Sequence, residues 1–214
     1  MTTMTQKRPA TIIRTLRRSE SIPEELARFR YQVTVIDRGL TDLPGADHQH
    51  RVVEDRLDAL SQFQVAYQEG KIVGCVRGTY ARDLEIGDPL IKLYGVDRVS
   101  ERERLSSSLS TQLMVTADRR GMILAARLVT ALYRQSTRDG MDWDFLDCNL
   151  ELEPFFHRFG YRRFLGVIDR PGFGKVVSMV LPAVDRERME ALRSPFLPHT
   201  PDREQHYEQI VCAS

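Results

Sequence analysis

Two groups of residues have the types and spacing to do chemistry, and the first is a polar turn. The run Ala117-Asp118-Arg119-Arg120-Gly121 follows a strand-like segment and precedes a long helical pattern. Such a turn brings unpaired backbone N–H groups and the positive end of a helix dipole to one place, which suits a phosphate. Arg119 and Arg120 add positive charge, and Gly121 lets a ligand approach the backbone closely. An ordinary turn with solvated arginines would fit the pattern equally well.

The second group is a cluster of acids, Glu54, Asp55 and Asp58, followed by Arg77 in a later strand-like segment. A carboxylate here could bind an ammonium group or take its proton. Arg77 could hold a substrate carboxylate with two parallel hydrogen bonds. The alternatives are a solvated helix face for the acids and an ion pair between Arg77 and one of them.

Three further features of the sequence are weaker candidates for a functional site. His48 and His50 form an H-x-H pair, but no third or fourth ligand follows at a usual spacing, so we expect no metal site. Cys148 ends a strand and could be a nucleophile, yet no histidine flanks it, and buried cysteines mostly pack as small apolar side chains. His157 could serve as an acid or base near neutral pH, although a surface position is the more common one.

The elements that must position these residues follow from the spacing of apolar side chains. Ser21 is the predicted N-cap of a first helix that runs to about Val35, and Gly140 and Gly160 are predicted stops for later helices. Residues 37–51 are a predicted loop, and residues 81–108 are predicted to be irregular with short helices. Strands pair first as hairpins and later alternate with helices, which predicts one α/β (α+β) domain with a mixed sheet. The predicted strands are residues 11–16, 63–67, 71–80, 110–116, 143–148, 163–168 and 175–181, and the later helices are residues 119–138, 151–159 and 185–193.

In the second half of the chain, Val115, residues 120–125 and the spacing from Asn149 through Phe156 to Gly160 resemble the pattern of the GNAT superfamily of acyl-CoA-dependent N-acyltransferases. In that family a strand ending in Val precedes R-G-x-G-x-A at the start of a helix, and a strand ending in Asn precedes a short helix reading x-F-Y-x-x-x-G-F. The corresponding positions here are Val115, residues 120–125, Asn149, Phe156 and Gly160 with the tyrosine after it. The spacing from Asn149 through Phe156 to Gly160 matches without a gap. The resemblance covers roughly residues 20–182.

This resemblance implies a single GNAT-type domain with a mixed, mostly antiparallel central sheet flanked by helices. The strand that contains residues 113–115 would splay from the strand of residues 144–149, and the pantetheine arm of an acyl-CoA or acyl-phosphopantetheine co-substrate would insert between them. No tightly bound cofactor is expected. Asn149 would orient the arm, and backbone N–H groups near Met114 would polarise the thioester carbonyl. The implied donor-binding residues are Leu113, Met114, Val115, Arg119, Arg120, Gly121, Met122, Ile123, Leu124, Ala125, Asn149 and Phe156.

Two positions depart from the family pattern. Ile123 stands where the family usually has Gly, and its branched side chain would crowd a pyrophosphate. Phe156 stands where the family often has a Tyr that protonates the leaving thiolate, and a Phe side chain has no proton to donate.

The N-terminal half is more loosely similar to acyl-homoserine-lactone synthases and long-chain N-acyl amino acid synthases, which commonly use acyl carrier protein. The similar features are the acids at 54–58 and the strand Gly74-Cys75-Val76-Arg77. Carrier protein presents a single phosphate, so it would tolerate Ile123. The Glu-Ser-Arg trio that those synthases often carry is absent, because residues 109–111 read Leu-Ser-Thr. We therefore do not predict a homoserine-lactone synthase.

The predicted function is acyl transfer from a pantetheine thioester, on acyl carrier protein or CoA, to a primary amine of an amino acid or small metabolite. Glu54 or Asp58 would take the ammonium proton through water, and Asp55 and Arg77 would bind the acceptor. One alternative is an acetyl-CoA-dependent N-acetyltransferase of a metabolite or protein. Another is a non-catalytic module that binds acyl thioesters and regulates a partner.

Composition limits the remaining possibilities. The 31 Lys and Arg residues balance 30 Asp and Glu residues, so no strongly basic field exists and we expect no nucleic-acid partner. Three scattered cysteines, no long apolar run and no secretory signal predict a cytoplasmic protein without a membrane span. We expect residues 1–10 to be disordered, residues 11–182 to form the acyltransferase domain, and residues 183–214 to form a C-terminal helix and a proline-containing tail. The oligomeric state stays open.

Overall fold

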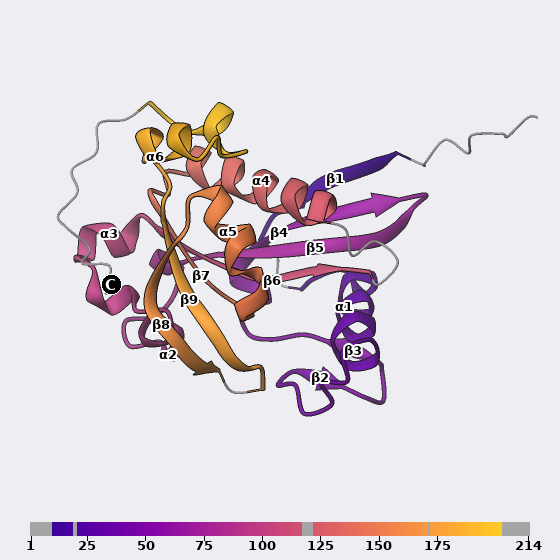
Figure 1. Ribbon diagram of the computed structural model, residues 1–214. Coiled ribbons are helices and arrows are strands. Elements are labelled where there is room, and N and C mark those ends of the chain that lie inside the picture. Colours follow the sequence, from indigo (N-terminus) through magenta and orange to yellow (C-terminus); the bar gives the residue numbers. More distant parts are fainter. Residues whose placement is uncertain (1–9, 19–20, 117–121, 171, 203–214) are drawn as a thin grey trace, which may run out of the picture.

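The computed structural model describes residues 10–18, 21–116, 122–170 and 172–202, and its centre is one seven-stranded sheet. The strand order is β1-β4-β5-β6-β7-β9-β8, and every neighbouring pair is antiparallel except β6 and β7. This arrangement confirms the predicted mixed, mostly antiparallel sheet (Figure 1). The strands are β1 (Thr11–Leu16), β4 (Ser61–Gln68), β5 (Lys71–Tyr80), β6 (Ser107–Val115), β7 (Trp143–Cys148), β8 (Arg162–Arg170) and β9 (Gly174–Pro182).

Helices and short turns connect these strands. The α-helices are α1 (Glu24–Tyr31), α2 (Pro89–Leu93), α3 (Glu101–Leu105), α4 (Met122–Arg138), α5 (Glu153–Phe159) and α6 (Arg186–Ala191). A π-helical turn, η1 (Gln32–Ile36), continues α1, and the 3-10 turns are η2 (Asp58–Leu60), η3 (Ala81–Asp83), η4 (Val96–Arg98), η6 (Leu150–Leu152) and η7 (Leu197–His199). A small second sheet pairs β2 (Ala46–Asp47) with β3 (Val52–Val53). Within the described ranges, no helix combines the length and the apolar character needed to cross a membrane.

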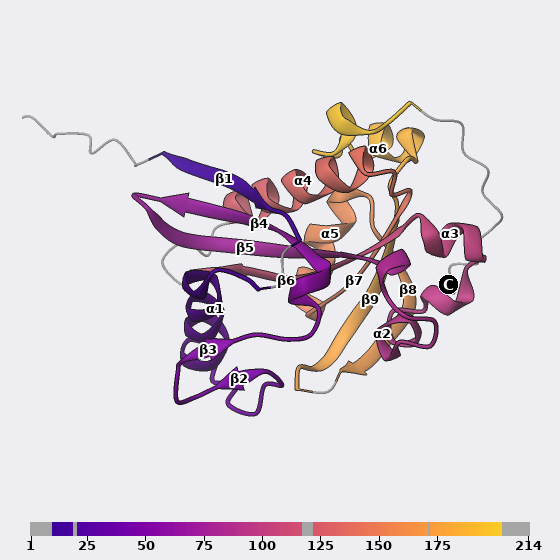
Figure 2. The same ribbon diagram turned by 180° about the vertical axis from the view of Figure 1, so that it is seen from behind.

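Helices cover both faces of the sheet (Figures 1 and 2). Alternation along β4 sends Phe63 and Val65 to one face and Ala66 to the other. α1 packs against Phe63 and Val65. α4 packs against Ala66 through Leu128 and Leu132, which lie one turn apart on the same side of the helix. The predicted apolar stripe of α4 is thereby confirmed at Leu124, Leu128 and Leu132, whereas Ile123, expected in the same stripe, is exposed.

α1 begins later than the sequence predicts. Ser21 is not its N-cap, because the helix starts at Glu24, after Pro23, and no side chain caps it. A residue that precedes proline avoids the helical region of backbone space, so Ile22 cannot continue a helix begun at Ser21. Pro23 itself has a φ of −57° and lacks the N–H that would be unpaired at a helix start.

The predicted loop at 37–51 includes one strand of the small β2–β3 sheet. Gly45 makes the close approach possible, because it has a φ of +85° and a Cβ there would lie 2.0 Å from the Glu54 carbonyl oxygen. The Glu54 N–H donates to the Gly45 carbonyl at 3.0 Å. This contact fixes the segment that carries the acidic cluster.

The segment after β9 packs on α4 and α5 rather than leaving the domain. Phe196 is fully buried, and its ring stacks on Tyr133 with centroids 3.9 Å apart. The Ser194 hydroxyl donates to the Phe159 carbonyl at 3.0 Å. The chain as far as Thr200, which is buried, is therefore part of the core packing.

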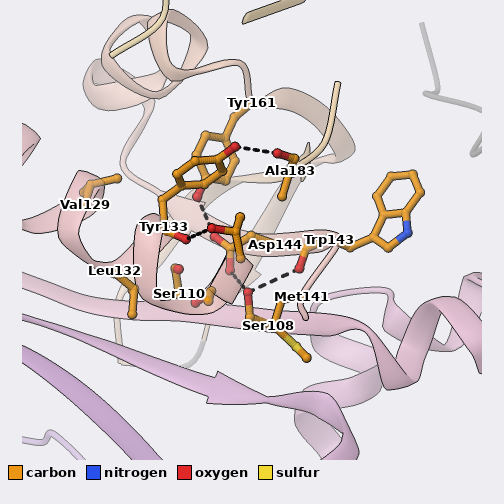
Figure 3. Close-up of a pocket in the computed structure, with 12 residues that line it drawn as sticks. Ser108, Ser110, Val129, Leu132, Tyr133, Met141, Trp143, Asp144, Tyr161 and Ala183 are labelled. Carbon is orange, nitrogen blue, oxygen red and sulfur yellow. Dashed lines mark hydrogen bonds between the residues drawn. The ribbon is translucent and has the colours of Figure 1, made fainter. Parts of the chain in front are cut away.

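A buried polar network lies on the α4 side of β6 and β7, around a cavity the size of one water (Figure 3). Asp144 accepts hydrogen bonds of 2.5 Å from the Ser108 hydroxyl and 2.5 Å from the Tyr161 hydroxyl. Burial raises the pKa of Asp144 to about 6, although these hydrogen bonds act in the opposite direction. No cationic side chain lines this cavity among the described residues. Asp144 of β7 thus connects Ser108 of β6 with Tyr161, the residue before β8, and no cationic side chain among the described lining residues balances its charge.

Candidate functional site

The parallel strands β6 and β7 separate part of the way along their length. Their pairing runs from Ser107 with Trp143 to Ser110 with Leu146, and in the described strands it extends no further. Residues 111–115 of β6 therefore diverge from the end of β7, as the resemblance to the GNAT superfamily implies. Strand edges that separate in this way leave backbone N–H and C=O groups for another extended chain to pair with.

A β-bulge in β6 lies where this separation begins. Cys75 pairs with Met114 and Arg77 pairs with Thr111, so Val76 stands opposite two residues of β6. One of them, Gln112, has a φ of +54°, which a residue with a side chain adopts only at a cost. An extra residue bends its strand and increases the local twist. No glycine or asparagine marks this bulge, so sequence patterns do not reveal it.

A cleft of about 410 Å³ lies at the opening between β6 and β7. It extends from the splayed strands to the loop before β2 and to the turn between β8 and β9, which approach each other at Pro44 and Gly172. Figure 1 shows the tip of the β8–β9 hairpin beside β2. Six of the residues expected at the site line the cleft: Asp55, Arg77, Leu113, Met114, Asn149 and Phe156.

Two arginines and two aspartates form a network along one wall. Arg77 Nη1 donates to both carboxylate oxygens of Asp55 at 2.7 Å and to Asp58 Oδ1 at 2.9 Å. Arg77 Nε donates to the Thr111 hydroxyl at 2.9 Å. Arg30 Nη1 donates to Asp58 Oδ2 at 2.6 Å, and the Arg30 side chain is completely buried. Two charges of each sign thus neutralise one another behind the cleft.

Asp55 is the acid of this network that reaches the cleft. Its side chain is 28% exposed, whereas the Asp58 side chain is 6% exposed and does not line the cleft. Burial alone would raise the pKa of Asp55, but the Arg77 and Arg30 guanidinium groups outweigh it and hold the pKa below its usual value. Asp55 is therefore a carboxylate at neutral pH.

Gln112 gives Asp55 a second polar neighbour. Its Nε2 donates to Asp55 Oδ2 at 3.1 Å. Its Oε1 is buried and accepts no hydrogen bond from any residue that the structure describes. A cationic group in the cleft would therefore meet a carboxylate and an amide oxygen together.

Glu54 and Asp58, the residues predicted as the base, lie elsewhere. Glu54 is exposed and is absent from the cleft lining. Asp58 is enclosed by Arg30 and Arg77, and it also accepts the Asp55 backbone N–H at 2.9 Å. The three acids are close in sequence but have three different environments.

The expected phosphate-binding turn is described only in part, because Arg119, Arg120 and Gly121 lie outside the described residues. Met122 and Ile123 begin α4 with exposed fractions of 52% and 78%, so their side chains form an apolar surface at that helix end. Leu124 and Ala125 are half-buried and pack towards the core. Val115, also expected to bind the donor, ends β6 outside the cleft lining.

On the other strand edge, Asn149 is exposed and begins the turn that leads to α5. Phe156 is 5% exposed and belongs to an aromatic cluster with Phe155 and Tyr161. The Tyr161 hydroxyl is committed to Asp144 and does not line the cleft. No tyrosine is among the described residues that line the cleft, so none of these residues offers a phenol that could protonate a thiolate.

Cys148 lines the cleft beside Asn149, but burial raises the pKa of its thiol to about 12. The neutral thiol is a poor nucleophile. The two loop histidines form hydrogen bonds with other side chains. His48 Nδ1 lies 3.0 Å from the Tyr31 hydroxyl, and His50 Nδ1 lies 2.7 Å from Asp47 Oδ2. In the described ranges, no group of three His, Cys, Asp or Glu side chains could hold a metal ion.

Sequence reasoning missed a second ion pair in the cleft, between Asp147 of β7 and Arg170 of β8. Arg170 Nη1 donates to both oxygens of Asp147, and the Tyr94 hydroxyl donates to Asp147 Oδ1 at 3.1 Å. Burial would lower the pKa of Arg170, but Tyr94 and Asp147 outweigh it, so the guanidinium stays charged. The available sequence signal was a second aspartate, after Asp144, within the strand 143–148.

The protein is similar to known proteins in its structure rather than in its sequence. No protein-family model matches the sequence, and no curated protein matches it either. The AHL synthase LasI is 15% identical, with 92% of this chain and 100% of that chain covered and a TM-score of 0.67.

Two other solved structures are similar. The CoA-dependent acyl-homoserine lactone synthase BjaI, solved with SAM and isopentyl-CoA, is 17% identical over 80% of this chain and 82% of its own, with a TM-score of 0.61. An acyl-CoA N-acyltransferase from Pseudomonas aeruginosa is 17% identical over 80% of this chain and 99% of its own, with a TM-score of 0.56. The chain therefore has the GNAT-type fold that acyl-homoserine-lactone synthases and acyl-CoA N-acyltransferases share.

Proposed function

We propose that this protein transfers an acyl group from a pantetheine thioester to a primary amine. The observation that carries the proposal is the separation of β6 and β7 at the Gln112 bulge, which opens into a cleft that contains the Asp55 carboxylate. The fold agrees with this chemistry, because LasI is an AHL synthase and the Pseudomonas aeruginosa neighbour is an acyl-CoA N-acyltransferase.

The donor would enter between the two strands. Pantetheine contains two amide groups, which can pair with an unpaired strand edge as an added strand does. Backbone N–H groups of residues 113–115 would polarise the thioester carbonyl, and a fixed donor at such a place contributes about 3–4 kcal/mol to transition-state stabilisation. Leu113, Met114 and Phe156 give the entry an apolar lining.

The acceptor amine would meet Asp55 and Gln112. We assign this role to Asp55 because Glu54 lies outside the cleft and Asp58 is enclosed by arginines. The ammonium group binds the Asp55 carboxylate and the Gln112 Oε1, loses a proton to water, and then attacks the thioester carbon. The C–N bond forms, the C–S bond breaks, the nitrogen gives its second proton to solvent, and the thiolate takes a proton from solvent.

The donor could be acyl-CoA or an acyl carrier protein, which share the same pantetheine chemistry. BjaI was solved with isopentyl-CoA. The exposed Ile123 at the start of α4 favours carrier protein here, because it leaves less room for a pyrophosphate than for a single phosphate. Parallel assays with acetyl-CoA, a long-chain acyl-CoA and an acylated carrier protein separate these donors.

A second candidate function has one observation in its favour. Phe156 cannot donate a proton and no tyrosine is among the described lining residues, so the protein could bind acyl thioesters without turnover. Such a module would be stabilised against heat by the thioester, with no release of thiol when amines are added. A ligand at about 100 times its dissociation constant adds about 2.7 kcal/mol to the free energy of unfolding.

The test is amine-dependent release of free thiol from each donor. We expect Asp55→Asn to lower kcat/KM for the amine at least tenfold, because a charge-assisted hydrogen bond contributes about 1.5–3 kcal/mol. The matched control is Glu54→Gln, an exposed acid one residue away, which should change kcat/KM less than about twofold. Equal losses in both variants, or thiol release that does not depend on amine, would exclude Asp55 as the acceptor-binding residue.

A further inference from the structure

The ion pair between Arg170 and Asp147 is a charged feature of the cleft that the proposed transfer does not use. We propose that Arg170 binds a carboxylate of the acceptor, so that the acceptor is an amine that also carries a carboxylate, such as an amino acid. This inference rests on the proposed function and specifies its acceptor.

Arg77, the arginine that the sequence suggests for this role, is already occupied. Its side chain is 3% exposed. Its Nε donates to Thr111, and its Nη1 donates to Asp55 and Asp58. An arginine used in this way positions acids and has little surface left for a ligand.

Arg170 is better placed to bind a ligand, because its side chain is partly exposed whereas that of its partner, Asp147, is buried. The Asp147 side chain is 2% exposed and the Arg170 side chain is 20% exposed, so the pair turns its positive member to the cleft. Asp147 engages only Nη1 of Arg170. A guanidinium group has five N–H donors, so donors remain for a second carboxylate.

Aromatic rings hold the guanidinium in place. Its central carbon lies 4.6 Å from the centre of the Phe173 ring and 5.8 Å from that of Tyr94. Contacts of this kind attract a cation and limit its motion. An arginine that is oriented before the ligand arrives loses less entropy on binding, and its planar fork matches a carboxylate.

The cleft then offers a complementary site at each end of such an acceptor. Asp55 and Gln112 Oε1 accept hydrogen bonds from the ammonium group, and Arg170 donates hydrogen bonds to the carboxylate. All three residues line the same cleft. An amine without a carboxylate would leave Arg170 without that partner and would bind more weakly.

The experiment compares amino acids with their own amides as acceptors. The panel consists of the twenty L-amino acids, glycine homologues with one and two more methylene groups (β-alanine and 4-aminobutyrate), and the corresponding amides. We expect the wild-type protein to prefer the free acids. Arg170→Gln should raise KM for the acids about 10- to 100-fold, the range of a charge-assisted hydrogen bond, and should change KM for the amides less than about twofold.

The matched control is Arg162→Gln. Arg162 lies on the same strand, pairs with Asp185 at 2.7 Å and does not line the cleft, so the preference for acids should persist. Because Arg170→Gln leaves Asp147 buried without its cation, the double variant Asp147→Asn with Arg170→Gln restores neutrality and should lose the preference while staying folded. Thermal unfolding of each variant with the preferred amino acid gives a readout of acceptor binding that needs no turnover.

The outcomes separate the inference from the function on which it rests. Amides acylated as well as acids by the wild-type protein, or a preference for acids that survives Arg170→Gln, would overturn the role of Arg170 and leave acyl transfer intact. Acylation of no amine from any thioester would overturn the proposed function, and the inference with it.

Discussion

Residue types and spacing located one side of the candidate site. Asp55 and Arg77 were expected to bind the acceptor, and both line the cleft. Their roles depend on distances that a sequence does not contain, because Arg77 is almost fully buried and its Nη1 donates to Asp55 and Asp58 rather than to a ligand. Asp147 and Arg170 are 23 residues apart, and nothing in their spacing indicates that they meet.

Asp58 illustrates how an acid in a motif can be structural. Its two oxygens are bound by Arg30 and Arg77, and Arg30 has no exposed side-chain surface. We expect Asp58→Asn to lower the free energy of unfolding by about 3–5 kcal/mol, because it leaves buried guanidinium charge without compensation. Denaturant titration measures this loss.

The control for that substitution is Asp37→Asn, at an exposed acid that accepts a hydrogen bond from the Gln32 side-chain amide at 2.8 Å. It should change the unfolding free energy by less than about 0.5 kcal/mol. An Asp58→Asn protein as stable as the wild type, but inactive, would indicate instead that Asp58 acts on the substrate.

At the scale of elements, the strands and the long helix were predictable, whereas their irregularities were not. Alternation along β4 and β5 and the apolar stripe of α4 were visible in the sequence, and β7 was predicted with the bounds it has. The bulge at Gln112 gave no signal, because it depends on pairing with β5 and has no glycine. The proline at position 23 overrode a good N-cap at Ser21.

The network of Ser108 in β6, Asp144 in β7 and Tyr161 before β8 predicts a dependence of stability on pH. Burial raises the pKa of Asp144 to about 6, above its value in the unfolded chain, so the folded state holds the proton more tightly. This stabilisation is complete below about pH 4 and is lost as pH rises through about 6. The rise in the Asp144 pKa from 3.8 to about 6 corresponds to about 3 kcal/mol in the free energy of unfolding.

Asp144→Asn imitates the protonated acid and should remove this dependence. The Ser108 and Tyr161 hydroxyl groups can each donate or accept, so they can rearrange around an amide. The difference in unfolding free energy between the variant and the wild type should therefore grow in favour of the variant from pH 4 to pH 6.5. Two parallel stability curves over that range would show that Asp144 does not titrate there.

At the scale of the whole molecule, sequence order and spatial order differ at the sheet's far edge. β9 lies between β7 and β8, so the hairpin of residues 162–182 folds back and brings Arg170 to the cleft. Composition and element order indicated a single mixed sheet, but only the resemblance to a known family indicated where that sheet opens. The position of residues 193–202 was not predictable, because proline spacing fits both a free tail and a packed segment.

The C-terminal segment gives a prediction about the domain as a whole. Phe196 is fully buried against Tyr133 and Phe159. Phe196→Ala should lower the unfolding free energy by about 3–5 kcal/mol, the cost of removing a buried aromatic ring. Ile86→Ala, at a side chain that is 90% exposed, is the control and should have little effect. Equal stability of both variants would mean that the segment is not part of the cooperative unit.

The central claim is that one cleft receives an acyl thioester between β6 and β7 and passes its acyl group to an amine at Asp55. The most direct measurement follows an isotope-labelled acyl group by mass spectrometry, from CoA or carrier protein to the amines of the panel. We predict one labelled N-acyl product for each thiol released by the wild-type protein, and at least tenfold slower formation of both with Asp55→Asn. Thiol released without any N-acyl product, or no release from any of the donors, would contradict the account.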